Sequence, residues 1–209
     1  MNWVVSFLLV ILRPALGLII LAGLLLYWVL KKKFPQEKFL KLIFYIFSSV
    51  IIFQSIFSTI LNWWLWSQQG ITQRLLPPYS SINYLLKYSW QHYWFESIVT
   101  IFTAIIVFLG IYFLNKKFEN HLFYDEEKYL AALGILATGW PNCLVFVTLV
   151  LFLGVLSHLL FLFMAIIKKR IEENPFRLSF LYFWIPVALL LLLLGDIINK
   201  YFGISQFVI

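Results

Sequence analysis

Long apolar runs separated by short charged clusters dominate the pattern of this sequence. The runs cover residues 3–30, 42–66, 93–115, 143–167 and 178–198. A helix needs about 20 apolar residues to cross the hydrocarbon core of a bilayer. The pattern therefore predicts a long membrane-spanning helix in each run. The more polar stretch 67–91 is expected to be an extramembrane loop.

Residues 129–140 form a further apolar segment that is too short to cross a bilayer alone. It ends at Gly139 and Pro141, which favour a break in the helix. Broken backbone can lie at membrane depth only where other protein segments cover it. We therefore expect an all-α fold: one polytopic membrane helix bundle over residues 1–209, with about six transmembrane helices and a short, broken fourth helix.

Composition supports a membrane location. The chain is 63% hydrophobic and only 12% charged, which excludes an ordinary soluble domain. Its net charge of +7 comes from lysines and arginines that stand mostly at the ends of apolar runs, where they set orientation and meet anionic lipid. We therefore expect the lipid bilayer as a partner and no binding to nucleic acid. No basic residue precedes the first apolar run, so we expect no cleaved signal peptide.

The basic residues also predict an orientation. Loops 31–41, 116–128 and 168–177 hold twelve of the 16 lysines and arginines. Cytoplasmic loops carry an excess of these residues, so the three loops are predicted to be cytoplasmic and both termini to lie outside.

An acidic cluster, Asp125, Glu126 and Glu127, stands directly before Lys128 and the short segment. Two carboxylates held close together can share a proton and activate water, because both cannot ionise cheaply. Acids at a helix start also interact favourably with the helix dipole and with nearby lysines. The sequence leaves both interpretations open, and Asp125 and Glu126 are the candidate catalytic residues.

A carboxylate pair needs a second acid from elsewhere in the fold. Glu37 in the first basic loop and Glu172 or Glu173 in the third lie on the same predicted side of the membrane. Their neighbours Lys38 and Arg170 offer ordinary surface pairing instead. None of these acids is a strong partner on sequence grounds.

Other ionisable residues give weaker signals. His158 lies in the middle of an apolar run, where it is either functional or a neutral histidine bonded to a neighbouring helix. His92 and His121 have no metal-ligand spacing to each other or to Cys143. We expect no metal site and no cofactor.

Three short motifs resemble the prepilin leader peptidases, the GxGD-type membrane aspartic proteases that cleave pilin leader peptides. Lys128 and residues 130–134 (LAALG), followed by Gly139 and Trp140, resemble the segment after that family's GxGDxK motif. Residues 30–35 (LKKKFP) resemble its basic run after an early helix, and residues 174–176 (NPF) resemble part of its PFGPF element. The resemblance covers most of the chain, and it implies the family's fold and a bacterial inner membrane location.

The departures from the family pattern fall on the catalytic positions. Trp28 stands where the resemblance implies the first aspartate, and Glu126 stands in place of the second. The extra methylene of a glutamate moves the carboxylate by over an ångström, a shift that can cost about a hundredfold in rate. We therefore expect a divergent, non-catalytic relative that binds a pilin-like leader helix or a pilus assembly partner.

Two other functions remain open. The chain could be a non-enzymatic subunit of a larger membrane complex, with its 22 phenylalanines packing against other subunits. Transport is a third possibility, since broken membrane helices line transport pathways.

Overall fold

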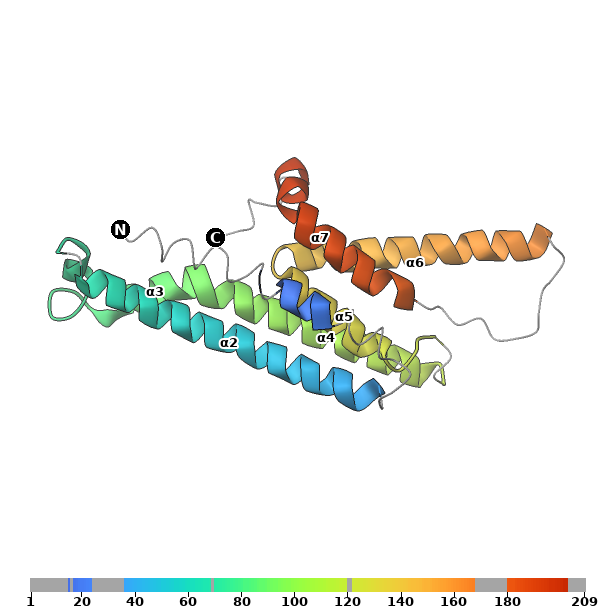
Figure 1. Cartoon of the computed structure of the whole chain (residues 1–209), viewed down its shortest axis with the longest axis horizontal. Helices are drawn as coiled ribbons and strands as arrows, with labels where there is room; N and C mark the ends of the chain where they lie inside the picture. Colours follow the sequence, from blue (N-terminus) through green and yellow to red (C-terminus); the bar gives the residue numbers. More distant parts are fainter. Residues whose placement is uncertain are drawn as a thin grey trace.

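Figure 1 shows the computed structural model of the chain, which describes residues 15, 17–23, 36–68, 70–119, 122–167 and 180–202. Every regular element within these ranges is a helix or a helical turn, and none is a strand. The predicted all-α class is confirmed.

Two long antiparallel helices run side by side through the molecule (Figure 1). The first is α2 (Gln36–Gln68); the second is the continuous series α3 (Ile82–Ser89), η2 (Trp90–Trp94) and α4 (Phe95–Lys117), in which η2 is a turn of π-helix. A hydrogen bond of 2.8 Å from Ser55 Oγ to Ser97 Oγ joins the two helices near their middles.

The connection between these helices is more helical than the sequence suggested. α2 already begins at Gln36, inside the predicted loop 31–41. A 3-10 turn, η1 (Thr72–Leu75), and the whole of α3 lie inside the predicted loop 67–91. The second half of the predicted loop is therefore helical, because α3 packs its buried residues Leu85 and Ser89 inward and continues into α4.

The short fourth helix is present as α5 (Glu127–Thr138). It packs against α2, α4, α6 and α7, and every one of its residues except Lys128 is buried. The helix ends at Gly139, whose φ of +67° lies in the region that favours glycine. The predicted break is confirmed, and the helix before it is enclosed by other helices, whereas Gly139 and Trp140 at the break itself are half-buried.

Two further helices complete the described bundle. α6 (Asn142–Ile167) buries Cys143, Phe146 and Val150 near its amino end. α7 (Leu181–Phe202) packs across both α5 and α6 and buries Trp184 and Leu191.

Among the described residues, three helices are long and apolar enough to cross a membrane: Glu37–Gln68, Ile82–Lys117 and Asn142–Met164. Tyr182–Gly195 of α7 is a shorter apolar helix. These helices are consistent with an integral membrane protein, and three candidate spans among the described residues fall short of the six crossings expected. Most of the first predicted run, 3–30, lies outside the described residues.

The element ends that border the basic loops all lie toward the right of Figure 1, although the carboxyl end of α6 stands apart from the others. A salt bridge of 3.0 Å from Lys128 to Glu37 joins the start of α5 to the start of α2. The carboxyl ends of α4 and α6 and the start of α7 lie toward this same end, at the right of Figure 1. Loop 168–177 itself lies outside the described residues.

Candidate functional site at the start of α5

The turn that carries the acidic cluster is fastened to the end of α4. Asn115, which is only 6% exposed, accepts a hydrogen bond of 3.1 Å on Oδ1 from the backbone N–H of Phe123. The ring of Phe123 lies 5.6 Å from the ring of Phe180, measured between centroids. Residues from α4 and from the start of α7 therefore position the acids.

Glu127 is the buried member of the cluster, with 0% of its surface exposed. Its Oε1 accepts a hydrogen bond from Tyr124 N at 3.2 Å. Its Oε2 accepts from Phe180 N at 3.0 Å and from the indole Nε1 of Trp184 at 3.3 Å. A buried carboxylate is tolerated when donors compensate for its lost hydration, and this one has three.

These bonds also explain what Glu127 does for α7. The first backbone N–H groups of a helix have no partner inside the helix, and acids near that end interact favourably with the helix dipole. Phe180 directly precedes α7, so Glu127 caps the amino end of α7 while it begins α5. Glu127 is therefore a positioning residue that joins two helices.

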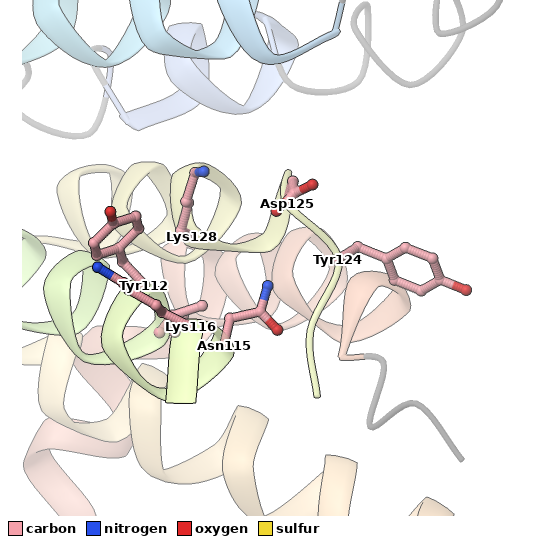
Figure 2. A pocket seen from close by; sticks show the side chains of 7 residues that line it. Tyr112, Asn115, Lys116, Tyr124, Asp125 and Lys128 are labelled. Carbon is pink, nitrogen blue, oxygen red and sulfur yellow. The ribbon is translucent and has the colours of Figure 1, made fainter. Parts of the chain in front are cut away.

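The two candidate catalytic residues are placed differently. Asp125 is exposed and lines a pocket of about 330 Å³ (Figure 2). The other lining residues are Ile111, Tyr112, Asn115, Lys116, Tyr124 and Lys128. Glu126 is half-buried and does not line this pocket; its carbonyl accepts hydrogen bonds of 3.1 Å from Tyr129 N and Leu130 N. Of the two candidates, Asp125 and not Glu126 lines this pocket.

Lys128 connects the pocket to α2. Its Nζ lies 3.0 Å from Glu37 Oε1, with the lysine side chain 13% exposed and the glutamate side chain 56% exposed. The ammonium also lies 5.4 Å from the ring centroid of Tyr129 and 5.9 Å from that of Tyr112, within range of cation–π attraction. Glu37, a candidate second carboxylate, is therefore bonded to a lysine. The other candidate second acids, Glu172 and Glu173, lie outside the described residues. So does Trp28, which stands where the resemblance implies the first aspartate.

Within the described ranges, no three His, Cys, Asp or Glu residues form a group that could hold a metal ion. His92 lies against Tyr88 with ring centroids 4.3 Å apart, and Cys143 is buried as a thiol.

A second polar region, which the sequence analysis missed, lies along the long helix pair. Its members are buried polar side chains at helical spacing, and we call them the polar seam: Ser55, Ser58 and Asn62 on α2, and Ser89, Glu96, Ser97 and Thr100 on the facing helix. Polar side chains inside membrane helix pairs hydrogen-bond across the interface. Here Ser55 bonds Ser97, and Trp94 Nε1 donates to Thr59 Oγ1 at 3.1 Å.

The polar seam reaches the break between α5 and α6. The backbone N–H of Trp140 donates a hydrogen bond of 2.9 Å to Thr100 Oγ1, and that hydroxyl donates to the carbonyl of Glu96 at 2.7 Å. A backbone donor exposed by the break is therefore satisfied by a side chain of α4, as a bilayer requires.

The chain matches no protein-family model, no curated protein and no solved structure. Its resemblance to the prepilin leader peptidases therefore rests on the sequence motifs.

A sequence signal for the polar seam does exist. Ser55, Ser58 and Asn62 recur at intervals of three and four residues, which places them on one helix face. In the next long helix, Thr100 follows Ser97 by three residues and Glu96 by four. Two polar stripes within neighbouring apolar helices indicate faces that meet each other.

Proposed function

We propose that this chain is a non-catalytic, prepilin-peptidase-like membrane protein that binds a pilin-like leader segment at the pocket beside α5 without cleaving it. The observation that carries this proposal is the division of the acidic cluster. Glu127 has both carboxylate oxygens engaged by protein donors, whereas Asp125 opens onto a pocket that also carries Lys116 and Lys128.

Activation of water by paired acids needs two carboxylates close enough to influence each other's ionisation. Glu37, the one acid of α2, is instead bonded to Lys128. The resemblance implies a first catalytic aspartate where Trp28 stands, and an indole carries no acid. These features favour binding over hydrolysis.

The surface next to the pocket suits a helical ligand. Tyr112 lines the pocket, and Leu109, Ile105 and Phe102 continue from it along one face of α4 at helical spacing. All four side chains are at least 41% exposed. A peptide with a polar end and an apolar helix would place the polar end beside Asp125 and lay its helix along this face.

Binding and cleavage can be measured on one sample. The protein in lipid nanodiscs is titrated into a fluorescent synthetic leader peptide, and binding is followed by fluorescence anisotropy. The mass of the peptide is then measured by mass spectrometry to detect cleavage. We expect saturable binding and an intact peptide. Asp125→Lys should weaken binding about tenfold, because it replaces the pocket's acid by a base.

Glu119→Lys is the matched control, since Glu119 is an exposed acid of the same connection that does not line the pocket. Cleaved peptide would overturn the non-catalytic assignment. Equal affinities for the wild type, Asp125→Lys and Glu119→Lys would overturn the binding site.

A subunit of a larger membrane complex is the alternative, and α6 favours it. The second half of this helix exposes large apolar side chains in every direction: Val155, Leu156, Leu159, Leu160, Phe161, Leu162, Phe163, Met164, Ile166 and Ile167. If this helix joins other subunits, substitutions on it will change the mass of the complex in native gels, whereas Asp125→Lys will not.

A further inference from the structure

Two members of the polar seam carry buried polar atoms that have no hydrogen-bond partner in the described part of the chain: Asn62 Nδ2 and Ser89 Oγ. Asn62 is 7% exposed and Ser89 is 1% exposed. Buried polar atoms in native proteins are nearly always hydrogen-bonded, to protein or to ordered water. Ser48 Oγ of α2 is a third such atom, but only Asn62 Nδ2 and Ser89 Oγ lie in the same stretch of the helix pair, so one shared ligand there would satisfy both.

Two side-chain contacts bracket this part of the polar seam. Trp94 Nε1 donates to Thr59 Oγ1 at 3.1 Å on one side. The rings of Trp66 and Tyr88 lie 5.1 Å apart on the other side, measured between centroids. The two helices are antiparallel, so residues between these contacts on one helix face residues between them on the other.

Asn62 and Ser89 both fall in this interval. Asn62 lies one turn from Thr59 along α2, and Ser89 directly precedes the π-helical turn η2. Both side chains are buried, so both point into the helix pair rather than outward. Wide π-helical turns recur at functional sites, and this one makes up most of the interval on its helix.

We propose that a water molecule is bound between Asn62 and Ser89 and completes the polar seam. A water oxygen accepts a hydrogen bond from the amide Nδ2 of Asn62, and one water hydrogen is donated to Ser89 Oγ. The unpaired amide is a donor, which suits a water oxygen and repels a cation. The proposal does not depend on the function proposed above.

A double-mutant cycle on the full chain in detergent tests this assignment. Asn62→Leu, Ser89→Ala and the double variant are compared with the wild type by their thermal unfolding midpoints. If one water bridges both residues, each single variant leaves the water underbonded and lowers the midpoint. The double variant should then lower it no further than the worse single variant, because both substitutions remove the same bridge.

If each atom is unpaired, each substitution removes a buried unsatisfied group and raises the midpoint. That result would overturn the proposal. So would a double variant whose fall in midpoint equals the sum of the falls of the two single variants. Should Asn62→Leu fail to fold, Asn62→Ala takes its place in the cycle. An experimental structure that resolves ordered waters is the direct check, and a continuous contact between the two side chains without water would contradict the bridge.

Ser48 provides the matched control. It carries a buried hydroxyl on α2 without a partner in the described residues, seven positions before Ser55 and on the same helix face. The register of the Ser55–Ser97 bond places it opposite Ala104, which is fully buried and offers no polar atom. Ser48→Ala should therefore raise the midpoint or leave it unchanged, and it should show no coupling to Asn62→Leu.

Discussion

α5 and α6 are separated by only residues 139–141 and are both strongly apolar, yet they meet opposite surroundings. Other helices enclose α5 on all sides, and only Lys128 among its residues is not buried. The second half of α6 is largely exposed along its length. Apolar character thus identifies a membrane helix but does not say whether protein or lipid surrounds it.

Side-chain size explains much of this difference. α5 contains Ala131, Ala132, Gly134 and Ala137, all buried, and small side chains let neighbouring helices approach closely in a membrane. The second half of α6 carries leucine and phenylalanine on every face. Bulky side chains all round suit a lipid environment and prevent close packing.

The largest expected effect comes from removing the carboxylate that begins α5. Glu127→Ala leaves the backbone N–H groups of Tyr124 and Phe180 and the indole of Trp184 without their acceptor. The donors of Phe180 and Trp184 are buried, and each buried donor left unpaired costs about 1–3 kcal/mol, so we expect a loss of about 3 kcal/mol or more in the free energy of unfolding. Chemical denaturation in detergent measures it.

Asp125→Ala, two residues earlier and exposed, is the control and should change the free energy of unfolding by less than about 0.5 kcal/mol. Equal effects of the two substitutions would mean that the buried cap does not hold α5 against α7.

A smaller loss is expected where α5 meets α6. A Cβ on Gly134 would lie 2.2 Å from Cζ of Phe146, whose ring is fully buried and cannot move aside easily. Overpacking of this kind costs about 1–3 kcal/mol, which is the expected loss in unfolding free energy for Gly134→Ala.

Gly110→Ala is the matched control, because a Cβ on Gly110 of α4 meets nothing within 4 Å. For Gly110→Ala we expect no loss in the free energy of unfolding, and a gain of up to about 1 kcal/mol because alanine has the higher helix propensity. A neutral Gly134→Ala would contradict the close contact between α5 and α6.

Much of the fold follows from local pattern. Apolar runs predicted the long helices, and Gly139 with Pro141 predicted the break after α5. The extension of α2 back to Gln36 and the helical form of α3 were missed, because polar and aromatic residues within these stretches resemble loop composition. Whether such a stretch forms a helix depends on the burial of one of its faces against a neighbouring helix. That burial is a property of the tertiary structure.

The candidate site was harder to predict than the fold. Three adjacent acids look alike in the sequence, but the structure exposes Asp125, half-buries Glu126 and buries Glu127 completely. Glu127 is the one that meets Phe180 and Trp184, which lie more than 50 residues away along the chain. Only the position of α7 shows which acid is structural and which borders the pocket.

The end of α5 offers a subtler test. Thr100→Val removes the hydroxyl that accepts from Trp140 N, a part-buried bond of 2.9 Å between α4 and the break. We expect a loss of about 1 kcal/mol in the free energy of unfolding, because the half-buried backbone donor loses this acceptor. Thr148→Val on α6 is the control: that exposed hydroxyl bonds only to Leu144 O within its own helix, so its loss should be smaller. If Thr148→Val lowers the free energy of unfolding as much as Thr100→Val does, the hydrogen bond at the break contributes no more than an exposed bond within one helix.

The smallest effect is expected on the exposed half of α6. Phe163, which is 63% exposed, has few protein contacts to lose, so Phe163→Leu should change the free energy of unfolding by less than about 0.5 kcal/mol. Phe146→Leu on the same helix removes a fully buried ring and should cost about 1 kcal/mol. If instead both substitutions cost the same in a sample whose mass exceeds that of one chain, Phe163 is buried between chains. The exposure of α6 would then belong to the isolated subunit, and the difference between α5 and α6 would be one between internal and intersubunit packing.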